Sequence, residues 1–99
     1  MISRKDFIFT IGYQGDTAIV DGNNRKMYGN LGGKELAGKG LYKPAVCSAA
    51  YSGDQEEQRA ILDIYNEKSG SAYDSFEDLM KVFGVFGIPE NIVKVKIIR

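Results

Sequence analysis

The sequence predicts an α+β fold: an antiparallel sheet of three N-terminal strands and one C-terminal strand, with a helical middle, about residues 34–86, packed on one face. Three observations support this prediction. β-Branched and aromatic residues dominate the start of the chain, helix-type apolar spacing with capping residues follows, and an alternating apolar run comes near the end. The 99 residues, 43% hydrophobic and 26% charged, indicate a single globular domain over 1–99.

The predicted sheet begins with three strands. Residues 7–11 are apolar or β-branched at successive positions, which favours an inner strand, and residues 17–20 follow as the second. Asp21–Asn24 predicts a hairpin turn, because glycine and asparagine tolerate positive φ. Arg25–Tyr28 then returns as a basic edge strand. The alternating run 92–98 predicts a fourth strand beside the first.

Three segments of the middle region carry the first helix signals. Residues 34–37 predict a short helix within a glycine-rich loop. Pro44 can open a second helix over 45–51, because its fixed φ suits a first turn. The clearest signal covers 54–68, where three acids stand near the positive N-terminal end and Gly70 follows the last turn.

A fourth helix begins at Ser75, a favoured N-cap residue, and its apolar stripe indicates a buried face. If this helix continues to residue 86, Val82, Val85 and Phe86 extend the apolar arc beyond what a small sheet can cover. We therefore expect these three side chains to line a dimer or partner interface.

The composition argues against several kinds of chemistry. The chain has no histidine, and therefore lacks the commonest general base near neutral pH and the commonest metal ligand. Its one cysteine, Cys47, stands among alanines and a valine, which indicates packing rather than nucleophilic catalysis. We identify no catalytic, cofactor-binding or metal-ligating residues, and an enzyme is the less favoured interpretation.

The same composition predicts a cytoplasmic protein. A single cysteine cannot form an internal disulfide and fits a reducing compartment. The first residues lack the apolar stretch of a secretory signal. No apolar run approaches the roughly 20 residues of a membrane span.

The glycine-rich residues 29–40 predict a flexible loop that could contact an anion. Gly29, Gly32 and Gly33 would offer backbone N–H groups to a phosphate, and Lys34 its ammonium. The glycines do not have the spacing of a phosphate-binding loop, and no Ser or Thr follows the lysine. Binding of a small molecule or nucleotide is therefore the first alternative function.

Residues 35–50 resemble a helix-turn-helix DNA-binding motif, with a Glu-Leu-Ala first helix, a glycine turn and a second helix of small and apolar residues. The resemblance implies that the second helix enters the major groove, with Lys39, Lys43 and Ser48 as candidate nucleic-acid contacts. The second helix offers none of the Arg, Asn or Gln side chains that read base edges best, and the net charge is zero. Nucleic-acid binding is therefore the second alternative.

The missing catalytic residues and the wide apolar arc together favour a non-catalytic protein-interaction or accessory module. We expect its partner to be another protein or a second copy of the chain, as in a homodimer, and we expect no membrane association. Residues 1–50 carry seven Lys/Arg against four Asp/Glu, and residues 51–99 carry six against nine. Such an uneven distribution can steer a partner.

Overall fold

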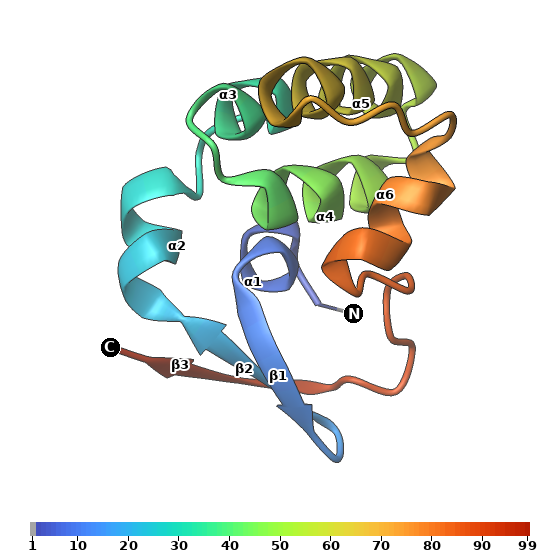
Figure 1. The fold of residues 1–99 in the computed structure, drawn as a ribbon. Coiled ribbons are helices and arrows are strands. Elements are labelled where there is room, and N and C mark those ends of the chain that lie inside the picture. The colour runs from blue at the N-terminus through green and yellow to red at the C-terminus, as the bar shows by residue number, and fades with distance from the viewer. Residues whose placement is uncertain (1) are drawn as a thin grey trace. The chain divides into compact units, whose positions relative to one another are not determined.

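The computed structural model describes residues 2–99, which form six helices and a three-stranded sheet (Figure 1). The predicted mixture of helices and strands is confirmed. In chain order the elements are α1 (Arg4–Ile8), β1 (Thr10–Gln14), β2 (Thr17–Asp21), α2 (Gly22–Tyr28), α3 (Gly33–Gly38), α4 (Tyr42–Ser52), α5 (Gln55–Ser69), α6 (Phe76–Phe83) and β3 (Lys94–Ile98).

These elements belong to two compact units. The sheet unit comprises the chain up to Leu31 together with Ile88–Arg99, and contains α1, α2 and the three strands. The helical unit, Gly32–Gly87, contains α3, α4, α5 and α6. The helical middle predicted over about 34–86 therefore corresponds to one contiguous unit, while the sheet unit is assembled from both ends of the chain.

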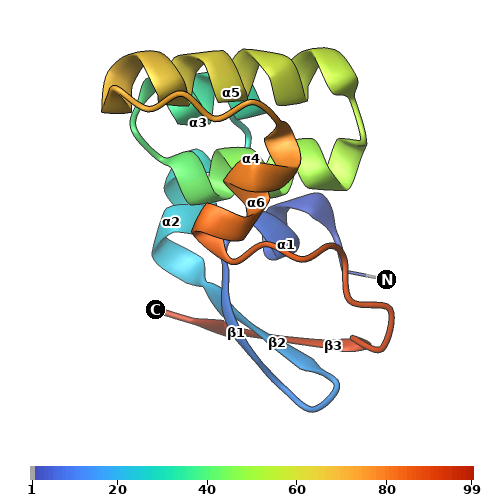
Figure 2. The ribbon, with the colours of Figure 1, turned by 45° about the vertical axis from the view of Figure 1, so that its right-hand side comes forward.

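The sheet is mixed, so the prediction of a purely antiparallel sheet is wrong. β2 lies between its neighbours, pairing antiparallel with β1 and parallel with β3 (Figure 2). A short turn joins β1 to β2, whereas the whole helical unit separates β2 from β3 along the chain. Parallel neighbours need a long connection of this kind, and the helical unit supplies it.

The N-terminal run 7–11 does not form the predicted inner strand, because α1 occupies its first part. The Ser3 hydroxyl accepts a hydrogen bond from the Asp6 N–H at 3.3 Å and so caps this helix. Phe7–Phe9 is buried. Consecutive apolar residues suit a buried helix end as well as a central strand, and so short a run does not distinguish the two. β1 follows it, and lies at an edge of the sheet.

The predictions of a hairpin turn at Asp21–Asn24 and of a strand at Arg25–Tyr28 are also wrong, because these residues lead into and form α2. The Asp21 carboxylate accepts hydrogen bonds from the backbone N–H and the side-chain amide of Asn24, at 3.2 and 2.9 Å. Aspartate and asparagine favour turns and helix caps for the same reason, since their short side chains bond nearby backbone groups.

Charged side chains join α1 to α2. Arg25 Nε donates to Asp6 Oδ1 at 2.6 Å. Arg4 donates to the carbonyl oxygens of Gly29 and Leu31, at 3.3 and 2.7 Å, just beyond the end of α2. These bonds hold α1 against the segment that follows α2 and give partners to carbonyl groups that lie outside the helix.

Gly22 brings the start of α2 close to the end of β3. A Cβ atom at this position would lie 2.6 Å from the Ile98 carbonyl oxygen and 2.7 Å from Ile97 Cγ2. Gly22→Ala is therefore expected to displace β3 and to lower the free energy of unfolding by about 1–3 kcal/mol. Faster hydrogen exchange in β3 would measure the displacement. Gly12→Ala is the control, since a Cβ there meets nothing within 4 Å, and equal effects of the two variants would contradict this prediction.

The helical unit contains the helices expected of the middle region, with ends that differ by a few residues. α4 contacts each of the other three helices of the unit. Each helix contributes one large, fully buried side chain to the core: Leu36, Val46, Ile61 and Leu79. Within residues 2–99, every helix is too short or too polar to cross a membrane.

α6 ends at Phe83, and not at residue 86 as expected. Gly84 follows with a φ of +69°, a conformation that favours glycine. The Val85 N–H then donates to the Met80 carbonyl oxygen at 2.8 Å. In this Schellman arrangement the chain folds back over the last helical turn, so Val85 is buried instead of continuing the apolar arc.

Candidate interaction surface

β3 presents apolar side chains to solvent along one edge of the sheet. Among residues 2–99 its one strand neighbour is β2, so its other edge is open. All five of its residues are exposed, including Val95, Ile97 and Ile98 at 39%, 46% and 39%. An exposed apolar strand at a sheet edge is suited to pairing with another chain.

The two faces of β3 differ in chemistry. Residues that pair across a sheet point their side chains to the same face. Val95 and Ile97 pair with buried residues of β2, whereas Lys94 and Lys96 pair with half-buried ones. The pairs are Val95 with Ala18, Ile97 with Val20, Lys94 with Thr17 and Lys96 with Ile19. One face of the edge, with Val95 and Ile97, is therefore apolar. The other carries Lys94 and Lys96, followed by Ile98, which pairs with Asp21.

The backbone of β3 alternates between its two edges. The Lys94 N–H donates to the carbonyl oxygen of Asp16, the residue before β2, at 3.1 Å. Successive strand residues direct their backbone groups to opposite sides, so Lys94 and Lys96 direct theirs toward β2. Val95 and Ile97 direct their N–H and C=O groups to the open edge, where an added strand can bond them.

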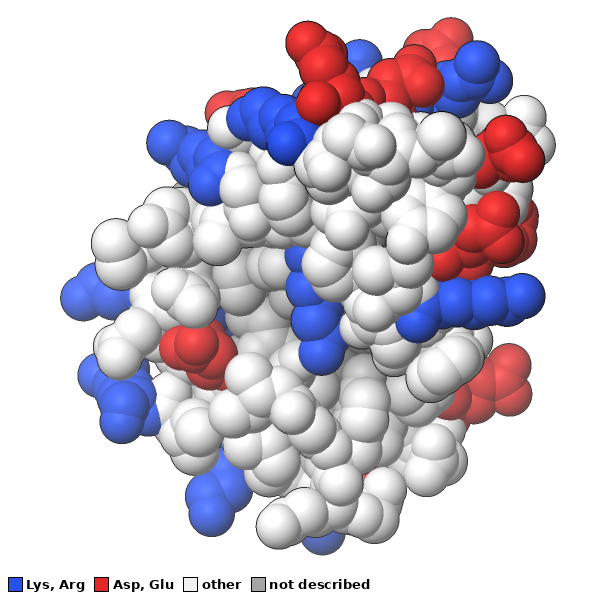
Figure 3. Space-filling model, in the orientation of Figure 1, with Lys and Arg blue, Asp and Glu red and all other residues white. Residues whose placement is uncertain are grey.

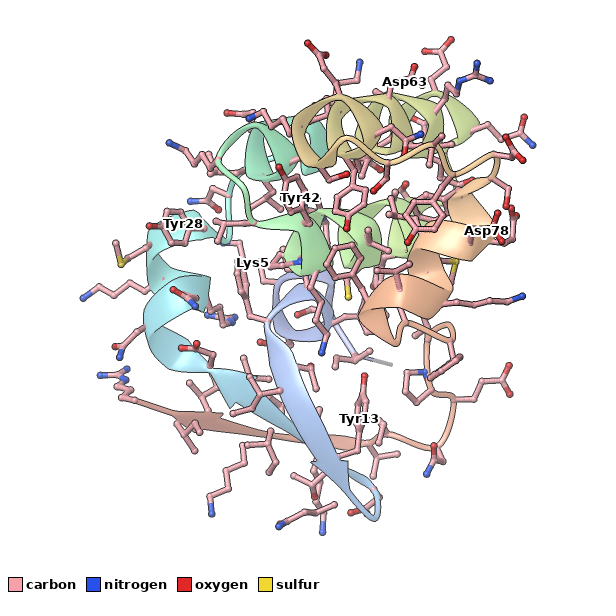
Figure 4. All side chains as sticks on the ribbon, in the orientation of Figure 1. Lys5, Tyr13, Tyr28, Tyr42, Asp63 and Asp78 are labelled. Carbon is pink, nitrogen blue, oxygen red and sulfur yellow. The ribbon has the colours of Figure 1, made fainter. Side chains whose placement is uncertain are left out.

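The opposite edge of the sheet, β1, is less regular. Its register with β2 shifts between Thr10 and Gly12, and Ile11, at this bulge, is 59% exposed. Tyr13 projects from the same strand and is also exposed (Figure 4). A bulge disrupts the hydrogen-bond ladder, which makes β1 less suited than β3 to accept a regular strand.

Positive charge is concentrated in the sheet unit. This unit holds seven Lys/Arg against four Asp/Glu, whereas the helical unit holds six against nine. Figure 3 shows acidic side chains gathered over α5 and the start of α6. Asp63 and Asp78 point outward from these two helices (Figure 4). On β3 the positive charges are Lys94 and Lys96, and Arg99 follows directly.

Two of the three side chains expected at an interface are exposed. Phe86 is 86% exposed and Val82 is 44% exposed, whereas Val85 is buried at 6%. The fold-back at Gly84 separates Val85 and Phe86 from the helix that carries Val82. The three residues therefore do not share one helical face, and their place in an interface stays a prediction.

The four predicted anion contacts are divided between the units. Gly29 ends α2 in the sheet unit, while Gly32, Gly33 and Lys34 lie at the start of α3 in the helical unit. The N–H groups of Gly32 and Gly33 already donate to carboxylates of the same chain, at 3.2 and 3.1 Å. The hollow at this place is lined by Gly32, Gly33, Lys34, Glu35, Asp54 and Glu57. Three acids oppose one lysine there, which disfavours the binding of an anion.

Glu57 connects three helices at this point. Its carboxylate accepts hydrogen bonds from the Gly33 N–H, from the Ser48 hydroxyl at 3.0 Å and from the Ser52 hydroxyl at 2.7 Å. These donors belong to α3 and α4, and Glu57 belongs to the first turn of α5. The geometry gives the start of α3 a structural role in the helical unit.

The segment 35–50 does contain two helices, α3 and α4, with a turn between them. α4 buries five consecutive residues, and Ser48 among them is 1% exposed. Lys39 and Lys43 are exposed. A recognition helix must present its side chains to the major groove, and α4 instead serves as core, so the order of helices fits the motif while the burial of Ser48 does not.

Cys47 is buried in α4, and burial raises the pKa of its thiol to about 11, partly offset by the Lys43 ammonium. Because the thiolate is the reactive form, labelling of the native protein by a maleimide at pH 7 should be roughly a hundredfold slower than that of free cysteine. The rate should keep rising with pH beyond pH 9. Mass spectrometry measures the labelled fraction, and rapid labelling at pH 7 would contradict this prediction.

Val95 and Ile97 are not among the site residues predicted from the sequence. The signal for them is the alternation of lysine with apolar residues over 94–98. Alternation predicts the strand, but it does not say whether the apolar face is covered by the chain itself.

Comparison with known proteins assigns no family to this chain. The chain matches no protein-family model, no curated protein and no solved structure. The chemistry of the candidate surface therefore follows from its residues alone.

Proposed function

We propose that this chain is a non-catalytic protein-interaction module whose binding surface is the β3 edge. The observation that supports the proposal is an edge strand with three large apolar side chains in solvent and an open row of backbone groups. Natural proteins usually shorten, cover or charge such edges, because an uncovered edge pairs with other chains. Here both lysines lie on one face, and Val95 and Ile97 leave the other face apolar and exposed.

The partner in this proposal is a polypeptide, either another protein or a second copy of the chain. Backbone pairing along β3 would supply affinity, and the side chains on its two faces would supply selectivity. The single cysteine supports a reducing, cytoplasmic setting for this interaction.

A photo-crosslinking amino acid at Ile97 tests the proposal in the cell of origin. Ile97 is exposed on β3, and Asp63, exposed on α5, provides the matched control position. We expect a discrete protein adduct from position 97 and its absence from position 63. An adduct of twice the chain mass would identify a homo-oligomer. The proposal fails if position 97 gives no discrete adduct, or gives the same adducts as position 63.

A further inference from the structure

The chemistry of β3 restricts what its partner can be. An added strand would lie in the plane of the sheet and bond the outward backbone groups of Val95 and Ile97. A helical partner cannot satisfy these groups, because its own backbone N–H and C=O groups are paired internally. The occupant of this edge is therefore an extended segment.

The side chains of that segment must match two faces. Residues opposite Val95 and Ile97 would meet an apolar surface, and residues opposite Lys94 and Lys96 would meet two exposed ammonium groups. Opposite charges across neighbouring strands stabilise their pairing, and like charges destabilise it. The net positive charge of the sheet unit acts in the same direction at longer range.

A second copy of the chain fits this edge poorly. The two-fold antiparallel register that pairs all of β3 with itself sets Lys96 opposite Lys96 of the second copy. A shift of two residues toward the N-terminus sets Lys94 opposite Lys96. Both arrangements place like charges directly across the new ladder, which is destabilising. A shift of two residues toward the C-terminus avoids the like charges, but it sets Lys96 opposite Ile98. β3 contains no Asp or Glu, so pairing of β3 with itself gives neither lysine a carboxylate partner.

We infer that β3 binds an extended acidic segment of another protein as a fourth strand, with Asp or Glu opposite the lysines and apolar residues between them. This inference rests on the proposed function and specifies its partner. Bonding to Val95 and Ile97 fixes the register of the segment, and Lys94 and Lys96 select its charge.

Selection from a displayed library of random linear peptides against the full chain tests this inference. We expect enrichment of peptides that alternate acidic with β-branched or aromatic residues. Affinity of a selected peptide should fall at least about tenfold for the Lys94→Glu/Lys96→Glu variant, which reverses both cross-strand charges. The matched control is Lys39→Glu/Lys43→Glu, which makes the same charge change in the helical unit and should alter affinity less than about twofold.

N-methylation of the peptide backbone provides a second readout on the wild-type protein, independent of whether the charge-reversed variant folds. Methyl groups at every second amide should abolish binding, and those at the intervening amides should be tolerated, because a strand bonds one neighbour through alternate residues. Enrichment of basic or uncharged peptides, unchanged affinity for the Lys94→Glu/Lys96→Glu variant, or no enrichment would overturn the inference. Crosslinking at Ile97 would then still test the proposed function separately. An adduct with a second copy of the chain would support a protein-interaction module and contradict the inference of an acidic segment from another protein.

Discussion

Replacement of Ile61 by alanine is expected to lower the free energy of unfolding by about 3 kcal/mol. Ile61 is fully buried in α5, and its Cδ1 atom would lie only 2.9 Å from a Cβ placed at Gly33, so it packs α5 closely against α3. Truncation would remove three buried carbon atoms and leave a cavity between these helices. Urea denaturation followed by far-ultraviolet circular dichroism measures the loss.

The control for this variant is Ile64→Ala, which makes the same truncation on the same helix at a half-buried position. A loss of about 1 kcal/mol is expected there, because less apolar area leaves water on folding. Equal losses at positions 61 and 64 would show that the contact between α5 and α3 does not form the core of the helical unit.

Glu57→Ala is expected to lower the free energy of unfolding by about 2 kcal/mol. A hydrogen bond to a charged group contributes roughly 1.5–3 kcal/mol, and the partial exposure of this carboxylate keeps the total effect of its bonds small. The variant would remove the acceptor shared by the Gly33 N–H and by the Ser48 and Ser52 hydroxyls. Ser48 is 1% exposed, so water does not readily replace the lost acceptor.

Glu56→Ala is the matched control for the Glu57 variant, because Glu56 lies in the same helical turn and is exposed. Glu56→Ala should lower the free energy of unfolding by less than about 0.5 kcal/mol, as is usual for surface substitutions. Urea denaturation measures both variants. If they lose equal free energy of unfolding, the Glu57 carboxylate does not connect the three helices as the geometry indicates.

The helical unit could largely be predicted from the sequence, because its signals are local. Asp54 caps α5 through the N–H groups of Glu56 and Glu57, and Ser75 caps α6 through that of Asp78. Such contacts span three residues or fewer, so a short window of sequence contains both partners.

The sheet unit could be predicted less well, because its signals conflict or act over long distances. The capping residues Ser3 and Asp21 convert segments with strand-like or turn-like composition into helices. The parallel pairing of β2 with β3 joins Thr17 to Lys94 across the whole helical unit, and no local pattern encodes it.

The candidate surface shows the same division between local and long-range information. Alternation over 94–98 predicts a strand with one apolar face. The exposure of that face follows from the position of β3 at an edge of the sheet, where it pairs with β2 and not with the first strand that was expected beside it.

Hydrogen exchange at individual β3 amides, measured by NMR on the full chain with and without a selected acidic peptide, tests the central claim most directly. In the free protein the amides of Lys94 and Lys96 should be protected by β2, while those of Val95 and Ile97 exchange rapidly. A saturating peptide should slow the Val95 and Ile97 amides at least about tenfold, because they then bond the added strand. Rapid exchange of these two amides in the saturated complex would show that the peptide binds elsewhere and that β3 is not the binding edge.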